Sequence, residues 1–314
     1  MKSMQEIIEP VDKALLKKEL NEERFLRHTN YGQNELYIVT QHDSPNVMRE
    51  IGRLRELTFR AAGGGTGKEM DIDKFDVDKD PYRQLISWDP KEDEILGGYR
   101  FKVCDHQTRA ETLATYKLFH FSEIFTRDYL PYTIELGRSF IQPNFQSTGS
   151  GRKTLYALDN LWDGLGALMV LHPEHRHFFG KVTMYPHFNQ QARDMILYFL
   201  HKEFHDARDL VHPKHPERLT TDARELEKLF EGHSYEKNLK ILSQEVRKLG
   251  ENIPPLINAY MNLSRTMKIF GTALNESFGN VEETGIMITI EDIYPKKKKR
   301  YIETFSRDRQ GENQ

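Results

Sequence analysis

The sequence lacks three features that would place it in a broad class of proteins. It contains one cysteine, Cys104, in 314 residues, which excludes an internal disulfide framework and fits a reducing compartment. It has no apolar run of about eighteen residues, so we expect no membrane-spanning helix, and its N-terminus lacks the apolar segment of a signal peptide. The net charge of −3 gives no general basis for binding nucleic acid. We therefore expect a cytoplasmic protein without a nucleic-acid partner.

The order of the predicted elements indicates an α/β (α+β) fold. A chain of this length can form one elaborated domain or two small ones. Predicted strands and helices alternate, but the strands at 84–88 and 95–103 flank a short polar turn and form an antiparallel hairpin. This favours a central mixed, mostly antiparallel sheet flanked by helices over a doubly wound sheet. Other strands are expected at 35–40, 132–142, 179–184 and 285–290, and helices at 1–27, 45–62, 189–204, 256–263 and after residue 152.

Changes in composition divide the chain into five predicted parts. The segment 206–250 is strongly charged, and its apolar spacing indicates two helices, the first with Asp222 and Glu225 as a capping box. The basic run Lys296 to Arg300 is either a solvated tail or a peripheral contact with the inner membrane, worth about 1 kcal/mol per basic residue. The parts are an N-terminal helix (1–30), a core (31–215), a charged helical insertion (216–250), the C-terminal part of the core (251–295) and a tail (296–314).

The stretch 132–168 combines a predicted strand, a glycine-bearing turn and a helix. The turn reads Gln146-x-x-Gly149-x-Gly151, and Arg152 falls in the first turn of the helix. Such a turn can direct backbone N–H groups at an anion, and the helix N-terminus adds a partial positive charge. Two interpretations remain open: the turn binds the phosphate groups of a pantetheine-type cofactor, or it is an ordinary polar loop.

Two charged residues, Glu135 and Arg138, interrupt the aromatic strand of this stretch. Three positions apart, they are expected on opposite faces of the sheet. Charges on a strand buried on both faces are costly, so one face should line a cleft or carry partners. Functionally, Glu135 could take a proton from an attacking amine, directly or through water. Structurally, it could form a cross-strand ion pair with Arg100, which lies on a neighbouring strand.

An acidic stretch imitates a cation-binding loop without matching one. It contains Asp71, Asp73, Asp76, Asp78 and Asp80. An EF-hand needs glycine at its sixth position and glutamate at its twelfth, and neither possible register supplies them. A solvated loop, or a site that binds a substrate ammonium group, remains as the interpretation.

Two further patterns are rejected as known sites. The glycine-rich segment 63–68 is one residue shorter than a P-loop, follows a helix, and has Glu69 where a P-loop needs Ser or Thr. Eight of the thirteen histidines fall within 172–215. His201 and His205 are one helical turn apart but lack the glutamate placement of HExxH. We therefore expect no metal site.

Taken together, these motifs resemble a known family. The chain is similar to bacterial amino-acid N-acyltransferases of ornithine-lipid and glycine-lipid (aminolipid) synthesis, some of them called hemolysin-like. These enzymes are related to acyl-homoserine-lactone synthases within the GNAT superfamily. The resemblance covers most of the chain, from about residue 53 to 290. Its pieces are RELTFR at 55–60, Glu69-x-x-x-Asp73-x-Phe75-Asp76, Arg100 in GGYRF, and Glu135-Leu136-Gly137-Arg138.

The resemblance implies an acyltransferase that moves a (3-hydroxy)fatty acyl group to the α-amine of glycine or ornithine. The donor would be a thioester on acyl carrier protein or coenzyme A, so an acyl-phosphopantetheine would be a co-substrate and no cofactor would stay bound. The turn at 146–151 is closer to coenzyme A-using GNAT enzymes, which leaves the carrier open. The alternatives are a signal synthase that uses S-adenosylmethionine and a non-catalytic scaffold that binds lipid or a partner.

The same resemblance suggests roles for individual residues. Thioester aminolysis needs a neutral amine and a stabilised oxyanion. Backbone N–H groups near 139–142 are the expected oxyanion donors. The candidate catalytic residues are Glu135, Asp73 and Asp76; the candidate substrate-binding residues are Arg55, Phe59, Phe75, Arg100 and Arg138; and the candidate contacts of the carrier are Gln146, Gly149, Gly151 and Arg152.

Overall fold

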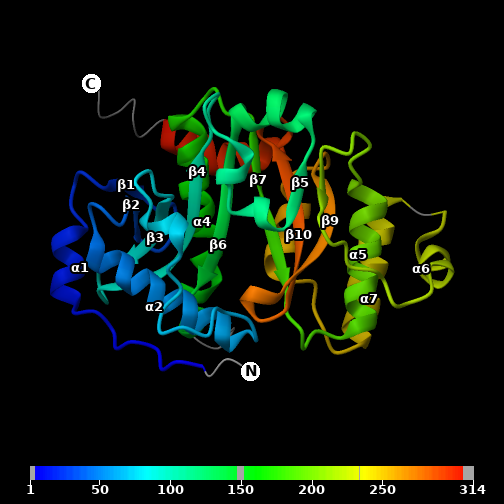
Figure 1. Cartoon of the computed structure of the whole chain (residues 1–314), viewed down its shortest axis with the longest axis horizontal. Helices are drawn as coiled ribbons and strands as arrows, with labels where there is room; N and C mark the ends of the chain where they lie inside the picture. Colours follow the sequence, from blue (N-terminus) through cyan, green and yellow to red (C-terminus); the bar gives the residue numbers. More distant parts are fainter. Residues whose placement is uncertain (1–3, 147–151, 233, 307–314) are drawn as a thin grey trace. The chain divides into compact units, whose positions relative to one another are not determined.

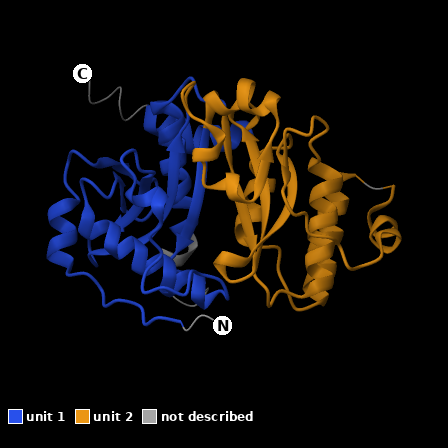
Figure 2. Ribbon diagram, viewed as in Figure 1, with its two compact units in different colours: residues 1–104, 134–176, 294–314 blue, residues 105–133, 177–293 orange. Residues whose placement is uncertain are grey.

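The computed structural model describes residues 4–146, 152–232 and 234–306, and the chain forms two compact units. Unit 1 comprises residues 1–104, 134–176 and 294–314, and unit 2 comprises 105–133 and 177–293 (Figures 1 and 2). In both units antiparallel strands are flanked by helices, as the sequence predicts. Among the described residues, no helix combines the length and apolar character needed to cross a membrane.

The described residues of unit 1 form five strands, in the spatial order β1-β2-β3-β4-β6, and each neighbouring pair is antiparallel. The strands are β1 (Phe25–His28), β2 (Glu35–Val39), β3 (Arg83–Asp89), β4 (Glu94–Val103) and β6 (Thr133–Ile141). Its α-helices are α1 (Lys13–Glu19), α2 (Pro45–Ala61), α3 (Lys74–Val77), α4 (Arg152–Leu171) and α9 (Pro295–Lys298).

Glycines bring the elements of unit 1 close together at two places. A Cβ at Gly164 of α4 would lie 2.6 Å from a Leu85 methyl group, so this glycine lets α4 pack directly on β3. A Cβ at Gly97 of β4 would lie 2.4 Å from the carbonyl oxygen of Phe140 on β6. The double glycine of GGYRF therefore permits the close approach of β6 that positions the candidate site.

Unit 2 contains the antiparallel strands β7-β10-β9 and a separate two-stranded pair, β5-β8. The charged insertion forms two helices, as predicted, and Phe230 of the first stacks on Tyr198. The elements are β5 (Phe119–Phe121), β7 (His177–Met184), α5 (Gln190–Phe204), β8 (Val211–Pro213), α6 (Ala223–Phe230), α7 (Tyr235–Lys248), α8 (Pro255–Met261), β9 (Lys268–Asn275) and β10 (Val281–Thr289).

The prediction of one N-terminal helix over 1–27 is wrong. The helix α1 is only seven residues long, begins after the N-cap Asp12 and ends before Leu20. Asn21 then accepts a hydrogen bond from the Glu23 N–H, which supports a turn in place of further helix. The strand β1 follows and pairs antiparallel with β2. Pairing with a neighbouring strand outweighs the local helical pattern here.

The C-terminal segment packs against α4 and is not simply a solvated tail. Tyr301 is only 4% exposed, and its hydroxyl donates to Asp159 Oδ1 at 2.6 Å. Arg300 forms an ion pair with the same aspartate. A Cβ at Gly166 of α4 would meet the Tyr301 backbone, so this glycine makes room for the segment. At least one cation of the basic run is thus already paired within unit 1.

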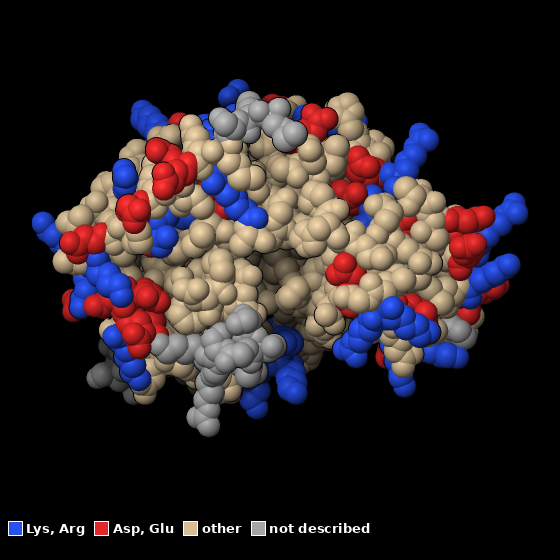
Figure 3. Space-filling view, turned by 90° about the horizontal axis from the view of Figure 1, so that it is seen from below, with Lys and Arg blue, Asp and Glu red and all other residues tan. Residues whose placement is uncertain are grey.

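Charged side chains of both signs are interspersed on the face drawn in Figure 3. This face shows no continuous basic surface of the kind that a nucleic-acid backbone requires. The distribution agrees with the nearly balanced net charge of −3.

The stability of unit 1 depends on pH through the buried Asp163 of α4. Its carboxylate is buried and accepts hydrogen bonds from the Asn30 N–H at 2.8 Å and Asn30 Nδ2 at 2.6 Å. Burial raises the pKa of Asp163 to about 6, although the bonds from Asn30 act in the opposite direction. The native state therefore holds this proton more tightly than the unfolded chain does. The resulting stabilisation is fully present below about pH 4 and is lost as the pH rises through about 6.

We predict that the wild-type protein gains about 1 kcal/mol of unfolding free energy relative to Asp163→Asn when the pH falls from 7 to 5. Urea unfolding of both proteins at the two pH values measures this difference. Asp80→Asn is the control, because Asp80 is exposed and should follow the wild type. Identical pH dependence of the wild type and Asp163→Asn would contradict the prediction.

Candidate active site

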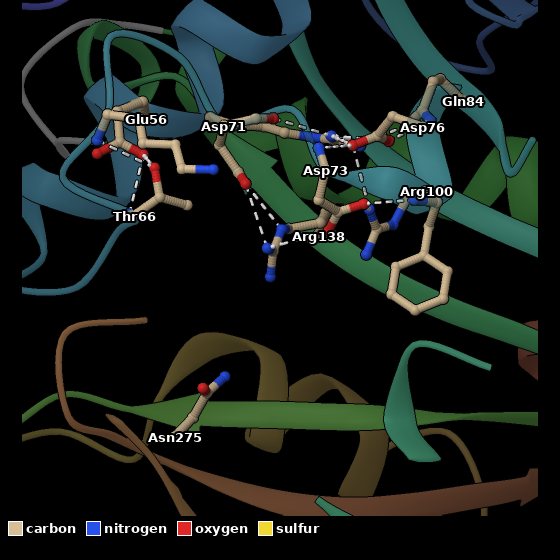
Figure 4. A network of polar contacts seen from close by, with 12 residues as sticks. Glu56, Thr66, Asp71, Asp73, Asp76, Gln84, Arg100, Arg138 and Asn275 are labelled. Atoms are coloured by element: carbon tan, nitrogen blue, oxygen red, sulfur yellow. Dashed lines mark hydrogen bonds and ion pairs between the residues drawn. The ribbon is translucent and has the colours of Figure 1, made fainter. Parts of the chain in front are cut away.

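Asp76 is the centre of a buried ion network in unit 1 (Figure 4). Arg55 Nη1 on α2 lies 3.1 and 3.2 Å from its two oxygens, and Arg100 Nη1 on β4 lies 3.2 Å from Oδ2. Gln84 Nε2 on β3 donates to Asp76 Oδ1 at 3.1 Å. Burial opposes ionisation of Asp76, but Arg55 and Arg100 outweigh it and hold the pKa of this carboxyl well below its usual range. A carboxylate so stabilised is a poor proton acceptor at neutral pH, so Asp76 is better suited to positioning than to base catalysis.

The local backbone orients the carboxylates of Asp73 and Asp76 in the acidic motif. Asp73 is the N-cap of α3, and its Oδ1 accepts from the Phe75 N–H at 2.9 Å. Asp76 Oδ2 accepts from the Asp73 N–H at 3.0 Å, which completes a capping box. The spacing Asp-x-x-Asp thus has a structural cause. Arg100 Nη1 also donates to Asp73 Oδ1 at 2.7 Å, so one guanidinium binds both carboxylates of the capping box.

Arg138 enters the network through a β-bulge in β6. Gly98 pairs with Phe140 and Arg100 with Gly137, so one residue of β4 faces two of β6. Arg138 has a φ of +48°, a left-handed conformation that is rare for a residue with a Cβ. Its Nε lies 2.7 Å from an oxygen of Asp71. Strained backbone of this kind persists where surrounding contacts hold it, and such residues cluster at functional sites.

Glu135 meets the same network through Tyr82. The Tyr82 hydroxyl donates to Glu135 Oε2, and Glu135 is only 1% exposed. The Arg100 guanidinium carbon lies 5.3 Å from the centre of the Tyr82 ring and 5.5 Å from that of Phe75. The expectation that Glu135 and Arg138 lie on opposite faces is therefore wrong. The bulge adds one residue to the strand and breaks the strict alternation on which that expectation rests.

The cross-strand register differs from the expected Glu135–Arg100 pair. Glu135 lies opposite Lys102, and Arg100 lies opposite Gly137. Arg100 directs its guanidinium to Asp73 and Asp76 instead.

The glycine-rich loop encloses a carboxylate of the chain itself. Glu56 of α2 accepts from the Gly67 N–H at 2.7 Å, and from the Thr66 N–H at 3.0 Å and hydroxyl at 2.7 Å. Arg60 Nε donates to the same carboxylate at 2.8 Å. These loop donors are thus already used, which gives a physical reason to reject the P-loop interpretation.

The remaining predicted residues are described less completely. Phe59 is buried on α2. Gln146 is exposed and its side chain donates to the Ile141 carbonyl oxygen. Gly149 and Gly151 lie outside the described residues, and Arg152 is described only as the first residue of α4. The predicted phosphate-binding turn therefore stays a prediction.

Sequence reasoning did not single out Tyr82 and Gln84, and it considered Asp71 only as part of a cation loop. Gln84 is a buried polar residue beside Leu85 and Ile86 in β3 and lies opposite Arg100 on β4. A buried polar residue at this position was the feature of the sequence that could have indicated a site residue. No feature of the sequence indicates Tyr82, because only the tertiary structure brings its hydroxyl to Glu135.

We predict that Arg55→Met lowers the unfolding free energy by about 3–5 kcal/mol, since it leaves the Asp76 carboxylate buried with one cation fewer. Arg49→Met on the exposed side of the same helix is the matched control and should change stability by less than about 0.5 kcal/mol. Chemical unfolding of both variants measures the two effects. Equal losses of unfolding free energy in the two variants would show that the buried Arg55–Asp76 pair contributes no more to stability than an exposed arginine of the same helix.

The sequence of this chain matches a known protein family over part of its length. The acetyltransferase (GNAT) domain family matches residues 54–155, which include the acidic motif and all three arginines. This match, with the antiparallel strands flanked by helices, confirms the predicted GNAT-like α/β fold.

Two relatives match nearly the whole chain. A glycine N(alpha)-acyltransferase of Phocaeicola vulgatus is 57% identical over 306 residues, which are 96% of this chain and 94% of that protein. A glycine N(alpha)-acyltransferase of Bacteroides thetaiotaomicron is 57% identical over 306 residues, 96% of this chain and 91% of that protein. Among solved structures, a CoA-dependent acyl-homoserine lactone synthase aligns at 11% identity over 87% of this chain and 90% of that chain, with a TM-score of 0.37. We base no conclusion about fold or function on a TM-score this low.

Proposed function

The chain belongs to the glycine N(alpha)-acyltransferase family and is an acyltransferase, and from this premise we propose that it transfers a fatty acyl group from a thioester to the α-amine of glycine. One observation of the structure carries the proposal. Three arginines and three aspartates form a network in unit 1, joined through Tyr82 to the buried Glu135.

The network suits an amino-acid zwitterion. Its three guanidinium groups and three carboxylates balance in charge, so a bound zwitterion leaves the net charge of the site unchanged. Asp73 and Arg138 are its more accessible members, with side chains 27% and 14% exposed. We assign the ammonium group of the acceptor to Asp73 and its carboxylate to Arg138, whose guanidinium can form two parallel hydrogen bonds.

The reaction is aminolysis of a thioester. The amine nitrogen attacks the carbonyl carbon, the C–N bond forms, the C–S bond breaks, and the carrier leaves as a thiol. Before the attack the ammonium group must lose a proton. We assign Glu135 as the base, acting through the Tyr82 hydroxyl that donates to it. Asp76 holds Arg55 and Arg100 in place, and the Phe75 ring packs against the Arg100 guanidinium.

The bulge in β6 offers a place for the carbonyl oxygen. An extra residue in a bulge stays outside the regular ladder, so its backbone N–H can point to a ligand. The Gln142 N–H donates to Leu96 O at 3.0 Å, so the predicted range of oxyanion donors is narrowed. We assign the oxyanion to backbone N–H groups within residues 139–141, beside Arg138.

The carrier of the acyl group is part of the proposal. A (3-hydroxy)acyl chain on acyl carrier protein is our first choice, and acyl-CoA is the alternative. The aminolipid product, and contact of Lys296–Arg300 with the inner membrane, are proposals of the same kind. The signal-synthase alternative requires S-adenosylmethionine as acceptor.

The purified protein, given acyl carrier protein or CoA thioesters together with labelled glycine, ornithine or S-adenosylmethionine, tests the proposal. Mass spectrometry should find N-acylglycine, and free thiol should be released only when glycine is present. An acyl product with another acceptor would overturn the assignment of glycine. Release of thiol that does not depend on an amine would overturn the proposed chemistry.

We predict that Glu135→Gln lowers kcat by about 10²–10⁴-fold, because glutamine cannot accept the proton. The melting temperature should change little, since the amide keeps the size of the carboxylate. Tyr82→Phe should lose activity similarly if the hydroxyl transmits the proton. Asp80→Asn, on an exposed aspartate that pairs with Lys102, is the control and should keep full activity. Unchanged turnover of Glu135→Gln would remove this residue from the mechanism.

A further inference from the structure

Two histidines and a glutamate lie together just after the C-terminal end of α4, within unit 1. His172, Glu174 and His175 belong to the sequence His-Pro-Glu-His that follows the helix. Each offers a ligand atom, and these atoms lie within 4.8 Å of one another. We propose that this turn binds a divalent transition-metal ion such as Zn²⁺, through one nitrogen of each histidine and the carboxylate of Glu174.

The ring of His175 is held in the tautomer that a metal ligand needs. Its Nε2 lies 2.7 Å from the carbonyl oxygen of Cys104, which can only accept, so Nε2 carries the proton. In a neutral ring the lone pair is then on Nδ1. A backbone carbonyl bound to the far nitrogen is the usual support of a metal-binding histidine, since it fixes both tautomer and ring orientation.

The opposite nitrogen of His175 has an unusual environment. The residue is only 7% exposed, and among the described residues Nδ1 makes no hydrogen bond. Glu174 Oε1 lies 3.1 Å from it. A lone pair facing a carboxylate at this distance is repelled unless a cation is shared between them. A proton or a metal ion can fill that role, and His172 adds the third ligand that favours a metal.

The surrounding backbone supports a cation at this place. The His172 N–H donates to Leu168 O at 2.9 Å, and the His175 N–H donates to His172 O at 3.0 Å, so the turn continues from the helix end. The C-terminal end of a helix carries partial negative charge, which favours a cation. Zn²⁺ binds imidazole nitrogen at about 2.0–2.1 Å and carboxylate oxygen at about 2.0–2.2 Å. Glu174 Oε1 and His175 Nδ1 are already 3.1 Å apart, and two ligands of a tetrahedral Zn²⁺ site lie about 3.5 Å apart. The three ligand atoms lie within 4.8 Å of one another, so binding requires His172 to move closer to the other two.

This inference revises the expectation of no metal site, which considered the His201–His205 spacing. It is independent of the proposed acyl transfer, because no proposed ligand belongs to the Asp76 network. Its test measures metal binding and does not depend on activity.

The experiment uses the full chain, stripped with a chelator, titrated with Zn²⁺ in a calorimeter and with Co²⁺ by visible absorption. We expect one ion per chain, with micromolar or tighter affinity and Co²⁺ bands typical of nitrogen and oxygen ligands. His172→Ala and Glu174→Gln should each weaken Zn²⁺ binding at least about 10-fold. These two positions are half-buried and exposed, so their variants should fold, whereas the buried His175 is left unchanged.

His201→Ala is the matched control. His201 on α5 and His205 at its C-cap have ring centres 4.7 Å apart and could bind metal adventitiously. The proposal requires that this variant keep the wild-type affinity. It is overturned if the chain takes up no Zn²⁺, if His172→Ala and Glu174→Gln bind Zn²⁺ as tightly as the wild type, or if His201→Ala loses the binding.

Discussion

The buried charge of Asp76 is the constraint on which unit 1 depends. Removing a carboxylate from water costs several kcal/mol, and only close cations and hydrogen bonds offset that cost. Arg55 from α2 and Arg100 from β4 supply the cations, and Gln84 from β3 supplies a further donor. These partners come from α2 and from both strands of the β3–β4 hairpin. Satisfying this one carboxylate therefore fixes where those elements meet.

The burial of Asp76 also determines which residues of the network are accessible to a substrate. Asp76 lies between Arg55 and Arg100, whereas Asp73 and Arg138 lie 3.5 Å apart at the more exposed margin of the network. Such a pair matches the ammonium and carboxylate groups of an amino acid. Under the proposed function, the inner residues hold the shape of the site and the outer residues meet the substrate.

The bulge at Arg138 connects the sheet to this network. A regular strand would direct Glu135 and Arg138 to opposite faces, whereas the extra residue and the left-handed backbone let both serve one site. The adjacent Gly97 lets the two strands come close, because a Cβ there would collide with the backbone of β6. The strain at Arg138 is sustained by its ion pair with Asp71, and it lies where the proposed oxyanion would bind.

The sequence by itself determined most helices and strands, the acidic motif, the arginines and the family that they resemble. Those features follow from local periodicity, capping and residue spacing, which act between near neighbours. The tertiary structure decided the rest. It joined Tyr82 to Glu135, placed Glu135 opposite Lys102, enclosed Glu56 in the glycine-rich loop and packed Tyr301 against α4. It also placed Nε2 of His175 within hydrogen-bond distance of the Cys104 carbonyl oxygen. Each of these contacts joins residues that are distant in sequence or depends on strand register, and neither propensity nor spacing encodes such a contact.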